Sequence, residues 1–457
     1  MNDYGDGDLI EEINSVSYFP HNFDDIWEIV QQKFKSDIKD LSDINLIFFQ
    51  NKSDLLKEIQ TTYPEEGSEF IKVFDYIRQL VLNIDKLLEK KINFLKRETT
   101  DKIILNRKQV ALIFILGFFD IFSIDMKKMC IYYRYDFHDI LTSKSGTNFQ
   151  KGRSFLNYMT IIGKWLSENN PVLEEKINYI RDKKDFKIKN FKDDIKLCKV
   201  EIYKEGSLFD SEASYCVDFA NMYIGGGALS GGCVQEEILF AVEPEAVVSM
   251  LFMEKMDSND AIRIDNLIQY SKYSGYGRSF KYVESAIKNI KDEKLIKHSI
   301  IAIDAICKFG GGLYDKDDVE RDIIKAYVGF NLVNFEDENI KSKEKTIATG
   351  NWGCGAFGGD FELKFLQQWI AASYAGLEKL YYYSFGRKEM ENIINNYKNL
   401  ELINARVLYN ALMEEELKKG SVLSTILENL NKTHLENIKE VDNNIRKKSC
   451  CKNCRIY

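Results

Sequence analysis

Five of the eight residues from 225 to 232 are glycines, and two adjacent glutamates follow at positions 236 and 237. Because glycine lacks a Cβ atom, such a loop turns sharply and its backbone approaches a bound ligand closely. Successive N–H groups of the turn form a concave site that suits phosphate oxygens. A largely apolar strand pattern, residues 217–220, leads into Asn221 just before the loop. The pattern predicts a strand and a phosphate-binding loop beside two carboxylates, which suits chemistry on a sugar nucleotide.

Length and charge limit the class of protein. The chain has 457 residues, of which 45% are hydrophobic and 29% charged, as in a globular protein of about two to three domains. Its formal net charge of −8 argues against a general nucleic-acid binder, whose surface carries a basic excess. We therefore expect no sequence-specific nucleic-acid binding, whereas a polyanionic substrate remains compatible with a groove that is locally neutral or basic.

The sequence indicates a nuclear or cytoplasmic protein that does not enter a membrane. Residues 1–12 show neither a basic nor an apolar region of a secretory signal. The longest apolar run, residues 110–119, is too short to cross a bilayer and predicts a buried helix. The nine cysteines are scattered, so reduced thiols are expected rather than a disulfide framework.

Residues 1–195 are expected to be mainly helical and to form an accessory region. Apolar residues recur at helical spacing over 71–81, and a second helix is expected over 106–122. The charged stretch 173–196 predicts a solvated helix and a connector.

Residues 196–415 predict an α/β domain. Strand patterns occur at 199–203, 299–306 and 380–385, and a helical pattern occurs at 362–375. Strands that alternate with helices indicate a sheet sandwiched by helices. The remaining residues, 416–457, predict a charged helix and a cysteine-rich tail. Its three clustered cysteines lack a fourth partner for zinc, so we expect a disordered tail, with lipidation as an alternative.

Three motifs resemble the signature of the poly(ADP-ribose) glycohydrolases: VDFAN at 217–221, GGG at 225–227 and QEE at 235–237. A second glycine-rich stretch, residues 348–360, resembles the second loop of the same family. The resemblance implies a macrodomain-like mixed sheet with an N-terminal all-helical accessory domain. It also implies hydrolysis of ribose–ribose bonds in poly(ADP-ribose), with little action on the last unit joined to protein. The substrates and partners would be poly(ADP-ribose) and proteins that carry it.

The glutamate pair is the expected catalytic centre. Neighbouring side chains in a strand or helix diverge, so we do not expect Glu236 and Glu237 to face each other across the scissile bond. The resemblance assigns catalysis to Glu237 and contact with substrate hydroxyls to Glu236. A purely structural alternative is a pair of carboxylates at a helix N-terminus, which the helix dipole favours.

The other candidate residues bind substrate. The amide of Asn221 would hold a ribose hydroxyl or orient Glu237, and the resemblance places Gln235 at the adenine edge. Asp210 is the candidate for reading adenine, although the chain is one residue shorter than the family there. The resemblance also implies backbone and ring contacts with the diphosphate, ribose and adenine from Gly225, Gly226, Gly227, Tyr276, Asn351, Gly353, Gly355, Ala356, Phe357 and Phe385.

Two alternatives compete with this interpretation. The first is a non-catalytic macrodomain that binds ADP-ribose, for which the phosphate loops alone would suffice. The second is a hydrolase that acts on protein-linked ADP-ribose and would use similar loops. The adjacent glutamates favour hydrolysis, because simple binding does not need them. The second loop lacks the lysine and Ser/Thr of a P-loop, which disfavours nucleotide triphosphate hydrolysis. The four histidines are isolated, so neither a metal nor a cofactor is expected, and we expect a monomer.

Overall fold

The computed structural model describes residues 18–19, 24–88, 92–97, 99–121, 135–291, 295–307, 314–334, 344–414, 417 and 420–430. Their contacts define two compact units, which are described separately. The first unit comprises residues 1–184 and 214–304, and the second comprises residues 185–213 and 305–457. The predicted domain boundaries at 195 and 415 stay predictions. The tail cysteines Cys450, Cys451 and Cys454 lie outside the described residues.

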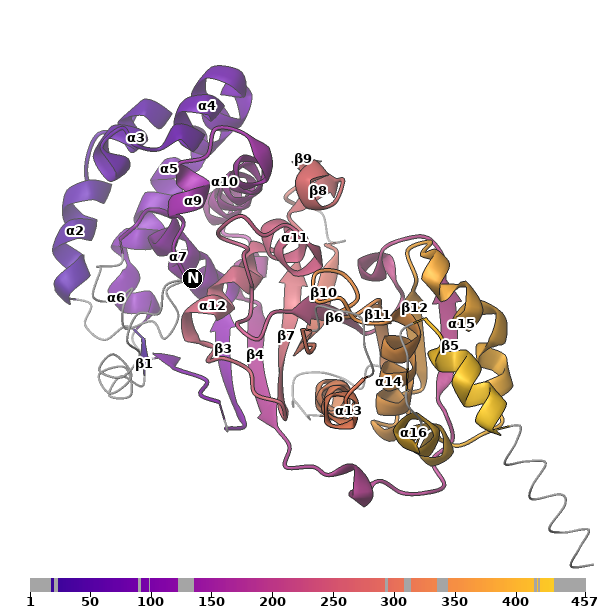
Figure 1. Cartoon of the computed structure of the whole chain (residues 1–457). Coiled ribbons are helices and arrows are strands. Elements are labelled where there is room, and N and C mark those ends of the chain that lie inside the picture. Colours follow the sequence, from indigo (N-terminus) through magenta and orange to yellow (C-terminus); the bar gives the residue numbers. More distant parts are fainter. Residues whose placement is uncertain are drawn as a thin grey trace, which may run out of the picture. The chain divides into compact units, whose positions relative to one another are not determined.

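Helices make up most of the N-terminal part of the first unit, as predicted (Figure 1). The helices of this unit are α2 (Asp24–Phe34), α3 (Leu41–Phe49), α4 (Asp54–Thr62), α5 (Pro64–Leu82), α6 (Ile84–Leu87), α7 (Arg107–Phe118), α9 (His138–Leu141), α10 (Gly146–Ser167), α11 (Gln235–Val242) and α12 (Ser249–Phe252). The long helices α5 and α10 pack together, and α5 includes the helix expected over 71–81. Gly163 permits this approach, because an added Cβ would lie 2.6 Å from the side chain of Val73.

The helix expected over 106–122 is α7, and its start is fixed locally. Asn106 caps it by accepting the N–H of Gln109 at 2.8 Å, and Gln109 Oε1 accepts the Asn106 N–H at 2.9 Å. This reciprocal pair is a capping box. The apolar residues that follow are fully buried, which confirms a core helix. Among the described residues, no helix is long and apolar enough to cross a membrane.

A mixed sheet forms the body of the first unit. Its strands are β3 (Asp101–Asn106), β4 (Lys176–Lys183), β7 (Asp260–Ile268), β10 (Lys297–Asp304) and β6 (Tyr215–Ala220), in that order. The β10–β6 pair is parallel and the other pairs are antiparallel. Two separate antiparallel pairs join β1 (Tyr18–Phe19) to β2 (Ile92–Asn93) and β8 (Ser271–Ser274) to β9 (Lys281–Ser285). The mixed sheet with helices is confirmed.

Besides the short strands β1 and β2, two longer strands lie inside the region that was expected to be all-helical. β3 is one, and β4 replaces the solvated helix expected over 173–196, so that prediction is wrong. Two charged residues of β4, Arg181 and Asp182, are buried in the sheet rather than solvated. Arg181 is fully buried and forms an ion pair with Asp260 on the neighbouring strand β7. A charge neutralised inside a sheet looks, in sequence, like a charge facing water.

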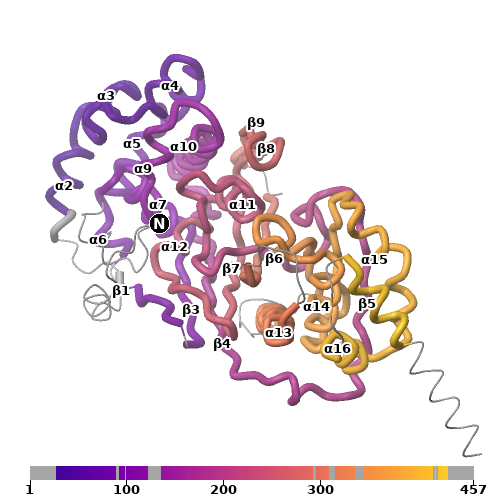
Figure 2. The backbone as a smooth tube through the Cα atoms, in the orientation of Figure 1, coloured from indigo at the N-terminus to yellow at the C-terminus, as the bar shows by residue number. Residues whose placement is uncertain are grey.

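The second unit holds three parallel strands in the order β11 (Thr346–Gly350), β12 (Lys379–Tyr383) and β5 (Lys199–Tyr203). Figure 2 shows the magenta β5 among the orange and yellow C-terminal segments of this unit, although it comes much earlier in the chain. The helices are α13 (Lys316–Asn331), α14 (Phe361–Tyr374), α15 (Glu391–Asn396) and α16 (Ala405–Glu414). The predicted strands and the helix over 362–375 are confirmed, and residues 422–430 are also helical.

Candidate active site

The glycine loop of the first unit follows the strand β6, as the sequence predicts, and leads into the helix α11, which was expected only in the structural alternative for the two glutamates. The buried strand β6 ends at Ala220, and α11 begins at Gln235. Because β6 runs parallel to β10, the loop leaves the carboxyl end of a parallel strand, where α/β folds commonly bind their ligands. Gly225 and Gly226 have φ values of 85° and 48°, a region that side-chain-bearing residues rarely adopt.

Glu236 holds the beginning of this loop. Its Oε1 accepts the Gly225 N–H at 2.6 Å, and its Oε2 accepts the Asn221 N–H at 2.9 Å. The side chain is 2% exposed. Burial raises the pKa of Glu236, as do the negative charges of Asp218 and Glu237, while the two N–H groups act in the opposite direction. Glu236 therefore fixes the loop and is largely withdrawn from solvent.

Glu237 is held at both oxygens by backbone groups. Its Oε1 accepts the Gly227 N–H at 3.0 Å, and its Oε2 accepts the Val234 N–H at 2.8 Å at the start of α11. A carboxylate oxygen has two lone-pair sites, so each oxygen keeps one for a proton or a ligand. Glu237 is thus a fixed carboxyl group with free proton-accepting capacity.

The two glutamate side chains do not diverge, contrary to the expectation from their adjacency. A Cβ added to Gly226 would lie 2.7 Å from Glu236 Oε2 and also 2.7 Å from Glu237 Oε1. Both carboxyl groups therefore turn back onto the same glycine. The loop curls around the first turn of α11, and the missing side chain of Gly226 leaves room for both carboxyl groups.

Asp218 is a third carboxyl group that sequence reasoning missed. It lies on β6, is fully buried, and neither of its oxygens has a hydrogen-bond partner among the described residues. Burial and the charge of Glu237 raise the pKa of Asp218 well above its usual range, which favours the protonated form. The available signal was an aspartate inside an otherwise apolar strand.

Asn221 and Gln235 flank the glutamates. Asn221 Oδ1 accepts the Tyr223 N–H at 3.0 Å, so this side chain braces the turn after β6. Gln235 Oε1 accepts the Phe219 N–H at 2.8 Å, and its Nε2 donates to the carbonyl oxygen of Val217 at 3.1 Å. Gln235 therefore pairs with β6, and its contact with adenine stays a prediction.

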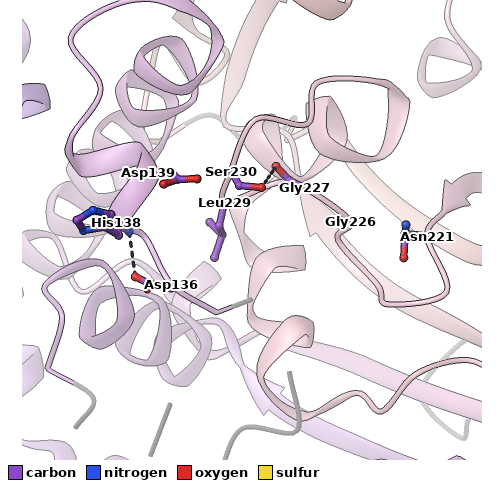
Figure 3. A pocket seen from close by; sticks show the side chains of 8 residues that line it. All are labelled: Asp136, His138, Asp139, Asn221, Gly226, Gly227, Leu229 and Ser230. Atoms are coloured by element: carbon purple, nitrogen blue, oxygen red, sulfur yellow. Dashed lines mark hydrogen bonds between the residues drawn. The ribbon is translucent and has the colours of Figure 1, made fainter. Parts of the chain in front are cut away.

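A cavity of about 470 Å³ opens beside the glycine loop (Figure 3). Asn221, Gly226, Gly227, Leu229 and Ser230 line it from the loop side, and Asp136, His138 and Asp139 line it from the helical side. Tyr276, the other candidate of this unit, follows the β8 strand and is 59% exposed.

The second glycine-rich loop lies in the second unit and joins β11 to α14. The side-chain amide of Asn351 donates to the Ser384 carbonyl at 3.0 Å and its oxygen accepts the Tyr382 hydroxyl at 3.1 Å. Gly353 has a φ of 71°, a value that favours glycine, so the backbone turns sharply at this residue. The backbone N–H groups of Gly355, Ala356 and Phe357 donate no hydrogen bond to any described residue. Three consecutive unused N–H groups are the arrangement that binds phosphate oxygens.

Phe385 follows β12 in an unusual conformation. Its φ is 53° and its side chain is 45% exposed. With this exposure, the ring is not a core residue at the end of the strand. A left-handed non-glycine residue costs on the order of 1–3 kcal/mol and is typically retained at functional sites.

Asp210 ends a short 3-10 turn, Leu208–Asp210, and is exposed, so its carboxylate is accessible.

Comparison with known proteins gives matches to two models of one family. The model described as "Poly (ADP-ribose) glycohydrolase (PARG), Macro domain fold" matches residues 188–392. The model described as the helical domain of the same enzyme matches residues 63–181. The expected combination of a helical region and a macrodomain is thereby confirmed.

Named relatives agree with these models. "Probable poly(ADP-ribose) glycohydrolase 2" of Arabidopsis thaliana is 36% identical over 233 residues, covering 43% of this chain and 44% of the relative. "Poly(ADP-ribose) glycohydrolase 1" of the same plant is 32% identical over 266 residues, covering 44% and 48%. "Poly(ADP-ribose) glycohydrolase 1" of Caenorhabditis elegans is 38% identical over 208 residues, covering 42% and 26%. The matched part is less than half the length of each relative. The helical and macrodomain matches together show that the chain belongs to the poly(ADP-ribose) glycohydrolase family.

Proposed function

We propose that this chain hydrolyses the ribose–ribose O-glycosidic bonds of poly(ADP-ribose) and releases ADP-ribose. The observation that carries the proposal is the fixed carboxyl group of Glu237, held at both oxygens by the loop whose Gly226 and Gly227 line the cavity. A protein that only binds ADP-ribose needs the loop but not a positioned acid. Family membership supports the same substrate.

In the proposed reaction Glu237 acts first as an acid and then as a base. Its proton passes to the bridging oxygen as the bond from that oxygen to the anomeric carbon breaks, which leaves an oxocarbenium-like ribose. A water molecule then adds to the anomeric carbon, and its proton returns to the Glu237 carboxylate. The carboxylate that Glu237 becomes when it gives up its proton favours the positive charge that develops on the ribose.

Other residues are proposed to hold the substrate. Glu236, although deeply buried, is proposed to contact ribose hydroxyls, and Asn221 lines the cavity and is proposed to bind a hydroxyl as well. In the second unit, the unused N–H groups of residues 355–357 suit a diphosphate, and the exposed ring of Phe385 suits stacking on adenine. Tyr276 is proposed to line the ligand site.

The test is incubation of the purified chain with poly(ADP-ribose) and, separately, with protein carrying single ADP-ribose units. We expect rapid release of ADP-ribose from the polymer and little release from the single units. Comparable rates on both would favour a hydrolase of protein-linked ADP-ribose instead. Binding of ADP-ribose without release from either substrate would show a non-catalytic macrodomain. A monomer in the nucleus or the cytoplasm is part of the same proposal.

A further inference from the structure

Lys151 is a fully buried lysine of the helical region, far in sequence from the glutamates. It lies near the start of α10 and is 0% exposed. Its Nζ donates hydrogen bonds to three backbone carbonyl oxygens: that of Gly227 at 3.3 Å, that of Gly232 at 2.8 Å, and that of Ser230. An ammonium group has three N–H donors, so this set of acceptors uses all of them.

The three carbonyls belong to the loop that surrounds Glu237. Gly227 accepts from Lys151 through its oxygen and donates to Glu237 Oε1 through its N–H. Gly232 also accepts from Lys151, and a Cβ added there would lie 2.7 Å from Glu237 Oε1. Lys151 therefore binds the loop at two glycines that both touch the proposed acid. It also binds Ser230, which lies between them in sequence, so its three hydrogen bonds span residues 227–232.

Burying the positive charge of Lys151 is unfavourable, and the three carbonyl acceptors offset this penalty. Burial of an ammonium group is unfavourable unless its donors are satisfied. Burial lowers the pKa of Lys151 to about 8, while the nearby charged forms of Cys233, Glu237 and Asp139 act in the opposite direction. The ammonium is retained at neutral pH, and its loss above pH 8 would leave two N–H donors for three carbonyls.

We infer that Lys151 is a positioning residue, through which the helical region holds the glycine loop in the shape that aims Glu237 at the substrate. The inference deepens the proposed function and rests on it. It gives the N-terminal helical region a definite role in catalysis that does not require contact with substrate. A lysine that only stabilised the fold would need no contact with the glycine loop, whereas this one donates to two glycines that both touch Glu237.

The test compares Lys151→Met with Lys164→Met. Lys164 lies on the same helix, is 33% exposed, and pairs with Glu69 at 2.7 Å rather than with the loop. We expect Lys151→Met to lower kcat by about 100-fold, as a displacement of about 1 Å can, with a much smaller change in KM. Lys164→Met should retain the kcat of the unaltered protein. If Lys151→Met does not fold, Lys151→Gln, which keeps two uncharged N–H donors, takes its place.

Two further measurements separate positioning from general stability. The ratio of the unaltered kcat to that of Lys151→Met should be large at pH 7 and shrink between pH 8 and 9.5, because only the unaltered protein loses an ammonium there. Amide hydrogen exchange over residues 225–234 should be faster in Lys151→Met than in Lys164→Met. A pH-independent ratio, or unchanged exchange in this loop, would overturn the inference.

The two proposals fail differently. If the unaltered protein releases no ADP-ribose, the proposed function fails, and the exchange measurement still decides whether Lys151 holds the loop. If the unaltered protein is active and Lys151→Met is equally active, the function stands and the positioning role is wrong.

Discussion

The Oε1 atom of Glu237 accepts the backbone N–H of Gly227 at 3.0 Å, and the carbonyl oxygen of the same glycine accepts from Lys151. One residue without a side chain thus transmits the position of a buried lysine to a carboxyl group. The bond ties the acid to the loop backbone, so any change that moves the loop also moves the acid.

Gly226→Ala should inactivate the site without unfolding the protein. The added Cβ would lie 2.7 Å from an oxygen of each glutamate, and the φ of 48° is unfavourable for alanine. The carboxyl groups must then shift, so we expect kcat to fall by at least about 100-fold. The measurement is kcat on poly(ADP-ribose) together with Tm.

Gly231→Ala is the matched control for that change. Gly231 belongs to the same loop, but a Cβ added there meets nothing within 4 Å. We expect nearly normal kcat. Equal losses in the two alanine variants would mean that loop flexibility, rather than the space beside the glutamates, matters.

Asp218→Asn should stabilise the fold increasingly as the pH rises. The pKa of Asp218 is raised in the folded protein, so the folded chain holds a proton that the unfolded chain has already released. The unaltered protein therefore loses stability as the pH rises from the unfolded pKa towards the folded one. We expect the Tm of Asp218→Asn to exceed that of the unaltered protein more at pH 8 than at pH 5. A Tm difference that does not change with pH would contradict the protonated state of this carboxyl group.

Phe385→Ala should weaken ADP-ribose binding and leave stability nearly unchanged. Stacking on a base contributes about 1–3 kcal/mol, so the Kd should rise by about 5- to 150-fold. The ring is 45% exposed, so its removal leaves no buried cavity and Tm should stay close to normal. Phe385→Tyr keeps the ring and should keep the affinity. Titration calorimetry with ADP-ribose measures both variants, and a normal Kd for Phe385→Ala would remove this residue from the site.

The strand β6 and the glycine loop could be predicted because their signals are local. Glycines mark positive φ values, and the adjacent glutamates follow directly in sequence. The loop over residues 348–360 was recognised in the same way. The enzyme family followed from motif resemblance, which neither composition nor periodicity could have supplied.

The elements that were missed depend on partners distant in sequence. Lys151 lies 76 residues from Gly227, so nothing near it marks it as part of the site. β4 was taken for a solvated helix because its Arg181 pairs with Asp260, 79 residues away. Asp218 was overlooked because an aspartate inside an apolar strand pattern does not by itself show that the carboxyl group is buried without a partner among the described residues. Both glutamate carboxyl groups lie against Gly226 because the loop folds over the first turn of α11. The fact that the two glutamates are neighbours in sequence does not determine this arrangement.

Glu237→Gln tests the central claim most directly. The amide keeps the size of the side chain but can neither donate nor receive the catalytic proton. The measurement is kcat on poly(ADP-ribose), with the Kd for ADP-ribose determined on the same preparation. We predict that kcat falls by about 100- to 10,000-fold while the Kd changes little. A variant that still hydrolyses the polymer at a normal rate would show that Glu237 is not the acid.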